Sequence, residues 1–106
     1  MTMPELDEII HQPVRLRLMA ALVAIKSGES AEFTFLRDML GVTDGNLGAH
    51  LHRLEEAGYI ELIKKFVDRK PRTFVAATAQ GRKVFRNQVV ALEEILKGAA
   101  GVKTKR

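Results

Sequence analysis

The sequence predicts an α+β fold, mainly α-helical with one small β-hairpin, on three observations. Apolar residues recur at helical spacing in several separate stretches. Branched and aromatic residues typical of strands replace that spacing at 59–67 and again at 73–77. A short basic segment joins these two strands, as a hairpin loop would. The 106 residues have the length of one domain, and we expect residues 1–106 to form a single unit.

Composition narrows the class of protein. No apolar run approaches the roughly 20 residues that span a bilayer. The first ten residues lack the basic and then apolar order of a secretory signal, so we expect a cytoplasmic protein. The chain has no cysteine, which excludes disulfides and thiolate metal sites. Because it has neither a glycine-rich phosphate loop nor a histidine near a nucleophile, we expect neither an enzyme nor a bound cofactor.

The first long helix is predicted to begin at position 13, where a proline stands. Proline is favoured at the first helical position because its missing N–H would be unpaired there anyway. Apolar residues recur from Val14 to Ile25, and Ser27-Gly28 supplies the stop. Arg15 and Arg17 could contact a nucleic-acid backbone, or Arg15 could pair with the acidic N-terminal segment, and both interpretations stay open.

Two short helices follow, separated by a tight turn. A short edge strand at 30–33 precedes them, and we expect Thr34 to cap the first helix. Gly41 ends that helix at a position where glycine permits a left-handed residue. Thr43 then caps the second helix, with Asp44 near its positive end. Two short helices around a glycine-containing turn predict a helix-turn-helix.

The hairpin and a last helix complete the chain. The two strands flank a predicted loop over 68–72, in which Pro71 stiffens one side. We expect Thr78 to cap a helix over 79–97 that ends before a glycine. Residues 98–106 form a tail that we expect to be disordered.

The second short helix has a buried face and an outward face. At about 100° per residue, Leu47, Leu51 and Leu54 lie within roughly 60° of one another and define the buried side. The opposite face begins with Gly45, which costs about 1 kcal/mol relative to alanine but lets another surface come close. Gly48 lies at the border with the preceding helix, where we expect crowding. The outward face and its flanks also carry Asn46, Ala49, His52 and Arg53.

The order of helix, helix, turn, helix, strand, basic loop, strand and helix predicts a winged helix-turn-helix. In that fold the helix after the turn lies in the DNA major groove. TDGNL, HL and LEEAGYI, within residues 43–60, resemble the recognition helix and the start of the wing in small MarR/ArsR-like winged-helix transcriptional regulators. HQPVRLRLMAAL, DRKPRTF and TAQGR resemble the same group, so the likeness spans residues 6 to about 96. The resemblance implies a dimeric repressor or activator that binds an operator.

The outward face and the wing supply the residues predicted to contact DNA. Asn46 and Arg53 have side chains that pair with base edges or with phosphate. The basic wing, residues 64–72, would contact phosphates, or one of its arginines would enter the minor groove. A solvated helix face and a solvated charged loop are the alternative interpretations. The predicted contacts are Thr43, Asp44, Gly45, Asn46, Ala49, His52, Arg53, Lys64, Lys65, Arg69, Lys70 and Arg72.

Two histidines of the second helix have different predicted surroundings. His50 lies beside the leucine stripe, so we expect it to be partly buried, whereas His52 points outward. Residues two apart on a helix diverge, and no carboxylate is placed to complete a ligand set. We therefore predict no metal site.

The last helix is predicted to pack against another helix. Four of its apolar residues follow the spacing four, three, four, which suits a helix–helix contact or packing onto the chain's own core. The apolar lead-in of residues 1–12 also needs a partner surface. A two-fold dimer would satisfy both segments. The predicted subunit contact comprises Leu6, Ile9, Ile10, Phe85, Val89, Leu92, Ile95 and Leu96.

These observations predict a dimeric DNA-binding transcriptional regulator. It would place helix 43–57 in the major groove and the wing on the adjacent backbone or in the minor groove. The alternative is a winged-helix protein-interaction module that uses the same face on an acidic protein partner. The residues do not identify an effector.

Overall fold

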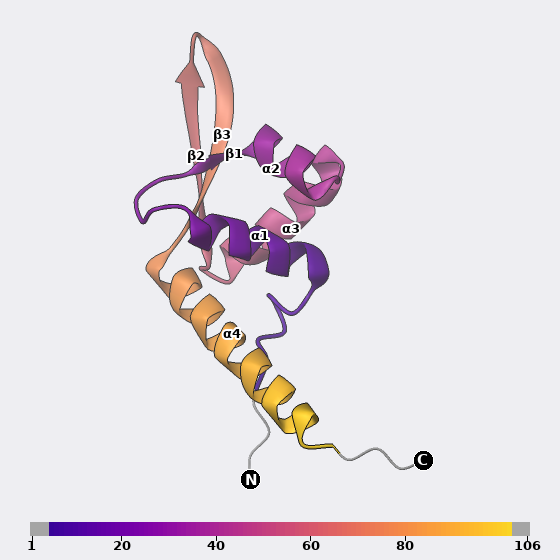
Figure 1. The fold of residues 1–106 in the computed structure, drawn as a ribbon. Coiled ribbons are helices and arrows are strands. Elements are labelled where there is room, and N and C mark those ends of the chain that lie inside the picture. The colour runs from indigo at the N-terminus through magenta and orange to yellow at the C-terminus, as the bar shows by residue number, and fades with distance from the viewer. Residues whose placement is uncertain (1–4, 103–106) are drawn as a thin grey trace.

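The computed structural model describes residues 5–102, which form four α-helices and a three-stranded antiparallel sheet (Figure 1). The helices are α1 (Pro13–Ala24), α2 (Phe33–Leu40), α3 (Asp44–Glu56) and α4 (Ala79–Ala100). The strands are β1 (Ala31–Glu32), β2 (Ile60–Val67) and β3 (Lys70–Ala77), in the order β1-β3-β2. The predicted fold class and the predicted order of elements are confirmed.

The molecule is elongated because two elements leave its body in opposite directions (Figure 1). The hairpin of β2 and β3 extends past α2 and α3 at one end, and the second half of α4 extends at the other. The principal dimensions are 64 × 28 × 22 Å. Within residues 5–102, no other element covers the tip of the hairpin or the end of α4.

The core lies between the helices and the base of the hairpin. Its buried apolar side chains are Ile10, Leu18, Met19, Leu22, Leu36, Leu47, Leu51, Leu54, Ile60 and Val75. The predicted buried face of α3 is confirmed by its three leucines. A buried leucine contributes about 2 kcal/mol, so three of them outweigh the roughly 1 kcal/mol that each glycine of α3 costs.

Two helix boundaries differ from the prediction. α2 begins at Phe33, directly after Glu32, which is extended and paired with β3, so Thr34 lies inside the helix and does not cap it. α4 continues through Gly98 to Ala100. Two alanines follow that glycine, and alanine has the highest helix propensity, which lets the helix continue. The first part of the predicted tail is therefore helical, while residues 103–106 and residues 1–4 of the lead-in lie outside the described residues.

Close contacts fix the start of α4 to the end of α3. Thr78 caps α4 as predicted, since its Oγ1 accepts a hydrogen bond from the Gly81 N–H at 3.0 Å. The same hydroxyl donates to the Gly58 carbonyl at 2.6 Å. A Cβ on Gly81 would lie 2.0 Å from the carbonyl oxygen of Tyr59, so only glycine fits there.

Polar contacts attach the lead-in and the end of α1 to α4. The Asp7 N–H donates to Oε1 of the buried Gln88 at 2.8 Å, and the Tyr59 hydroxyl donates to Asp7 Oδ2 at 2.5 Å. Arg82 of α4 donates to the carbonyl oxygens of Val23 at 3.2 Å and Ile25 at 3.0 Å, where α1 ends. The guanidinium thus supplies a positive charge and donors to carbonyls that α1 leaves unpaired.

Candidate nucleic-acid interface

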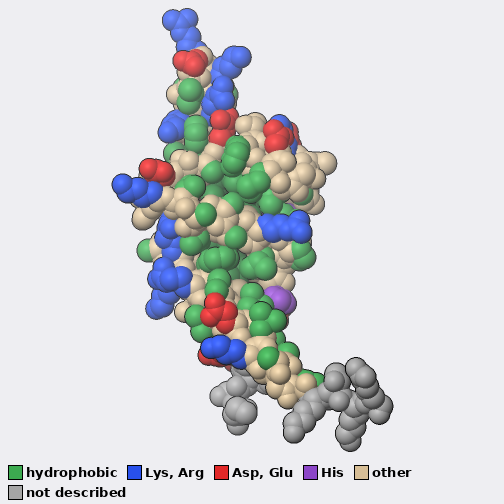
Figure 2. Space-filling view, viewed as in Figure 1, with side chains coloured by type: hydrophobic (Ala, Val, Ile, Leu, Met, Phe, Trp, Pro, Cys, Tyr) green, Lys and Arg blue, Asp and Glu red, His purple; other side chains and the backbone are tan. Residues whose placement is uncertain are grey.

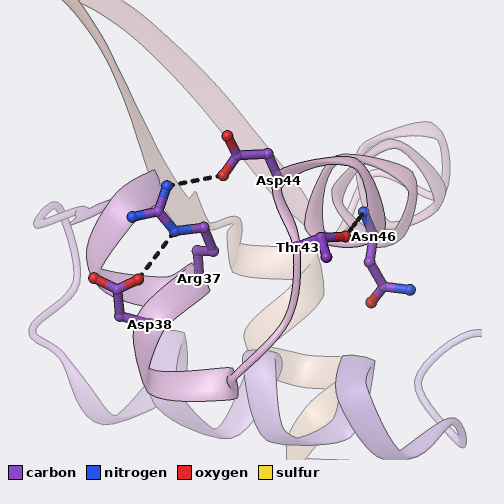
Figure 3. Close-up of polar contacts among 5 residues, drawn as sticks. All are labelled: Arg37, Asp38, Thr43, Asp44 and Asn46. Atoms are coloured by element: carbon purple, nitrogen blue, oxygen red, sulfur yellow. Dashed lines mark hydrogen bonds and ion pairs between the residues drawn. The ribbon is translucent and has the colours of Figure 1, made fainter.

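Local hydrogen bonds fix the turn that precedes α3 (Figure 3). Gly41 ends α2 in the left-handed conformation, with φ +65°, as the sequence predicts. Thr43 Oγ1 accepts a hydrogen bond from the Asn46 N–H at 3.1 Å and caps α3, also as predicted. The first turn of α3 therefore has a defined direction before any partner binds.

Arg37 joins the two helices of the helix-turn-helix, and the sequence prediction missed it. Its Nη1 donates to Asp44 Oδ1 at 2.9 Å, and its Nε donates to Asp38 Oδ1 at 3.0 Å (Figure 3). These hydrogen bonds, together with the carboxylate charges, raise the pKa of Arg37. One carboxylate oxygen of Asp44 thus accepts from Arg37 and links α3 to α2. The sequence signal for this ion pair is an arginine in the last turn of α2 followed by an acidic residue in the first turn of α3.

The outward face of α3 is open to solvent over its whole length. Gly45, Asn46, Ala49, His52 and Arg53 are all exposed. No atom outside the local helix backbone and the chain neighbours lies within 4 Å of a Cβ built on Gly45. The same holds for the other glycine of α3, so the crowding predicted at Gly48 is wrong. A flat surface can therefore approach the first turns of α3 closely.

The two histidines of α3 differ as predicted. His50 is half-buried, and its Nδ1 lies 3.1 Å from Arg15 Nη1. Burial and then the charge of Arg15 lower the pKa of His50, which stays neutral and accepts this hydrogen bond. Arg15 also donates to the Ile9 carbonyl, so it binds the lead-in through the backbone. His52 is exposed and pairs with Glu56 at 3.1 Å.

The hairpin turn is shorter than the predicted loop over 68–72. Asp68 and Arg69 form a two-residue turn with φ of +50° and +66°, and Lys70 already pairs with Val67. Two residues with positive φ match the twist of the flanking strands in a two-residue hairpin. Pro71 consequently stands in β3, opposite Phe66. Arginine in the left-handed region costs more than glycine would, and here it stands at the tip of the wing.

Two cations of the wing contact other side chains of the protein, and the other three have no carboxylate partner within residues 5–102. Arg72 Nη1 pairs with Glu32 Oε1 at 2.6 Å, and this hydrogen bond lowers the pKa of Glu32. Arg72 therefore joins β3 to β1, and its predicted contact with DNA, which stays a prediction, would have to compete with this ion pair. Lys65 Nζ lies 4.3 Å from the centre of the Phe74 ring. Within residues 5–102, no carboxylate lies at ion-pair distance from the remaining three cations, Lys64, Arg69 and Lys70. Figure 2 shows Lys and Arg side chains gathered on the hairpin.

The residues predicted for a subunit contact differ in how far they are exposed to solvent. Ile10 is fully buried in the core of its own chain, so its predicted place between subunits is wrong. Leu6, Ile9, Phe85 and Leu92 are half-buried. On α4, the exposed apolar side chains are Val89, Val90, Ile95 and Leu96, of which Val90 was not predicted.

Two other kinds of feature are absent from the described part of the chain. Residues 5–102 contain no cluster of three or more His, Asp or Glu side chains that could hold a metal ion. No helix in this part is long and apolar enough to cross a membrane.

The sequence and the fold are both similar to those of known proteins. The family model for winged helix DNA-binding domains matches residues 14–96. An uncharacterised protein of Methanocaldococcus jannaschii is 33% identical over 90 residues, which cover 85% of this chain and 95% of that protein. The structure of a transcriptional regulator homologue from Pyrococcus horikoshii OT3 has a TM-score of 0.78 at 31% identity, covering 88% of this chain and 89% of that one. The S. aureus MepR–DNA complex has a TM-score of 0.71 at 15% identity, covering 88% and 73%, and shares the fold.

Proposed function

The chain belongs to the winged-helix DNA-binding domain family, as a MarR-like transcriptional regulator, and from this premise we propose that it works as a homodimer in the cytoplasm. Each subunit inserts α3 into a major groove and lays the wing along the adjacent backbone or minor groove. One observation carries this proposal. Three buried leucines hold α3 in place, while its opposite face is exposed and begins with Gly45, where an added Cβ would meet no atom within 4 Å beyond the local helix backbone and the chain neighbours.

The charges on this surface support a polyanionic partner. Arg53 of α3 is exposed, and so are Lys64, Arg69 and Lys70 of the wing. These cations have no carboxylate at ion-pair distance within residues 5–102, so binding phosphate would not require breaking an internal ion pair. Glu56 and Asp44 lie on the same helix, and their negative charges favour a fixed docking position over uniform attraction.

The exposed apolar end of α4 supports the homodimer. Leu96 is 69% exposed and Val90 is 52% exposed, on a helix whose second half extends away from the body (Figure 1). A second copy that covers this segment would bury apolar surface at about 25 cal/mol per Å². Two recognition helices would then lie about one helical turn of DNA apart.

Binding to duplex DNA tests the DNA-binding part of the proposal. Fragments selected from the source genome serve as operator, and random duplexes as the comparison. A plot of log affinity against log salt should be steep, and Lys70→Ala should lower its slope by about 1, as removal of one phosphate-binding cation does. Arg69→Gly should act in the same way, and glycine relieves the strained turn, so weaker binding would not come from misfolding. Lys83→Ala, an exposed cation on α4, is the matched control.

Two results would contradict this part of the proposal. Wild-type protein that shows no salt-dependent binding to duplex DNA would favour the acidic protein partner instead. Unchanged salt slopes in both wing variants would remove the wing from the interface.

Sedimentation equilibrium tests the homodimer. Replacing Ile95 and Leu96 together by lysine should give a monomer, because two charges would enter the subunit interface. Both side chains are exposed in the single chain, so the fold should survive. Phe35→Lys, at a position of similar exposure on α2, should stay dimeric. A monomeric wild type at micromolar concentration would contradict the proposed interface.

A further inference from the structure

Phe66 is a large aromatic side chain that the described part of the chain leaves exposed. At 76% it is the most exposed large apolar side chain within residues 5–102. It lies in β2 near the tip of the hairpin, which projects beyond the body of the molecule (Figure 1). Exposure of a whole aromatic ring in water is unfavourable, and nothing in the described chain needs it there for packing.

The register of the hairpin shows how Phe66 is presented. Side chains two apart along a strand share a face. Ile60 and Leu62 of β2 therefore share a face with Phe66, and at the base this face packs on the core. Beyond the core it continues with Lys64 and ends with Phe66 opposite Pro71. The tip thus presents an apolar pair on a sheet face that has run past the body.

The charges around this pair identify the kind of partner. Lys64 is exposed and shares the face of Phe66, whereas the exposed Lys65 and Lys70 lie on the opposite face of the hairpin and Arg69 lies in the turn. Asp68 in the turn is the one carboxylate among residues 64–72. An apolar ring at a hairpin tip that carries one cation on the same face, two on the opposite face and one in the turn suits a polyanion that also offers apolar surface between its charges, which duplex DNA does through its sugars and base edges.

We propose that Phe66 binds DNA by entering the minor groove as an apolar wedge while the cations at the hairpin tip bind the flanking backbones. This inference rests on the proposed function and assigns to the wing a second kind of interaction. Apolar side chains that enter the minor groove partly unstack a base step and bend the duplex. Pyrimidine–purine steps such as TA deform most easily, so Phe66 would give the protein a preference for such a step without a hydrogen bond to a base.

The test compares Phe66→Ala with the wild type on a duplex selected from random-sequence DNA. We expect affinity to fall about tenfold at every salt concentration, as when an aromatic ring that stacks on a base is removed. The salt slope should not change, because every cation that binds phosphate remains in place. Phe66→Lys should steepen the slope without restoring the preference for the deformable step. Phe35→Ala, which removes another exposed ring outside the wing, should bind as the wild type does.

A second measurement detects the wedge directly. A TA step in the minor groove that faces the wing is replaced by a stiff A-tract, and 2-aminopurine at the step reports unstacking by its fluorescence. The wild type should prefer the TA duplex and raise the fluorescence, whereas Phe66→Ala should do neither.

Four outcomes would overturn the inference. Equal affinity and equal step preference in Phe66→Ala and wild type would overturn it while leaving the proposed function intact. A wild type without salt-dependent duplex binding would overturn both. A loss of affinity in Phe66→Ala with no step preference in the wild type would assign the ring to the backbone alone. Binding to phosphatidylglycerol vesicles that depends on Phe66, with duplex binding unaffected, would assign it to a membrane surface.

Discussion

Two helices of this chain carry glycine in their first turns, and the reasons are opposite. In α4, the carbonyl oxygen of Tyr59 lies 2.0 Å from where a Cβ on Gly81 would stand. In α3, Cβ atoms on Gly45 and Gly48 would meet nothing within 4 Å. The glycine of α4 is required by close packing inside the fold, whereas the glycines of α3 weaken the fold slightly and leave room outside it. Replacement of the α4 glycine by alanine should therefore lower the stability of the fold, whereas replacement of the α3 glycines should raise it slightly. The effect on DNA binding is expected instead in α3, at its outward-facing glycine.

The largest effect is expected for Gly81→Ala. The methyl group would collide with backbone, which cannot rotate away as a side chain would, so α4 must shift from the end of α3. We expect a loss of about 3 kcal/mol or more in the free energy of unfolding, measured in urea. Gly98→Ala in the same helix has open space and should gain about 0.5 to 1 kcal/mol. If both variants changed stability equally, the close approach at Gly81 would be wrong.

Arg82→Ala should have the next largest effect, because the start of α4 also holds the end of α1. The variant leaves the carbonyls of Val23 and Ile25 without their charged donor. We expect a loss of about 2 kcal/mol, the range for hydrogen bonds to a charged group. Thermal and urea unfolding measure it, with Lys83→Ala as an exposed neighbour of little effect. If Arg82→Ala lost no more unfolding free energy than Lys83→Ala, water would replace the guanidinium at these carbonyls and the prediction would be wrong.

Tyr59 gives the same junction a pH signature. Burial and then its hydrogen bond to Asp7 raise the pKa of Tyr59 to about 12, above the ordinary value near 10. Its contribution to stability is therefore complete below about pH 10 and is lost as the pH rises toward 12. The sequence has one tyrosine, so ultraviolet absorbance titrates this group alone. Native protein should still hold the phenol proton at pH 11, where urea-unfolded protein has lost most of it, and coincident titrations would contradict the buried hydrogen bond.

The smallest change in stability is expected in α3. Gly45→Ala and Gly48→Ala should each stabilise the free protein by about 0.5 to 1 kcal/mol, since alanine loses less entropy on entering a helix. Gly45→Ala should nevertheless weaken operator binding, because its methyl group would stand between α3 and the groove. Gly48→Ala should stay closer to wild-type affinity. Thermal midpoint and affinity measured on both variants decide this, and wild-type affinity in Gly45→Ala would remove close approach as the reason for that glycine.

Short-range patterns predicted much of this fold. The three leucines of α3 follow from helical periodicity, and the caps at Thr43 and Thr78 follow from the residues that begin helices. The left-handed Gly41 follows from its place between two helices. Each of these features depends on residues within about one or two turns of each other, which is the range in which a sequence pattern acts directly.

Two features that the sequence patterns did not indicate depend on residues far apart in the chain. Arg72 pairs with Glu32, and Ile10 joins a core made mostly of residues far along the chain. No local pattern marks either partner, because folding brings them together from distant positions. The turn at Asp68 and Arg69 was predicted as a longer loop because neither residue is the glycine or asparagine that usually adopts positive φ. Phe66 could have been noticed from its alternation with buried Ile60 and Leu62, which places it on the core face beyond the core.

The elongated shape affects how the mass of this protein should be measured. Its radius of gyration is 16.5 Å, against about 13 Å for a compact domain of this length. A rod-like particle has more friction with solvent than a sphere of equal mass. A single chain would therefore leave a gel-filtration column early, at the volume of a heavier globular standard, and would imitate a dimer. Only methods that report mass without assuming a shape, such as light scattering, distinguish one copy from two.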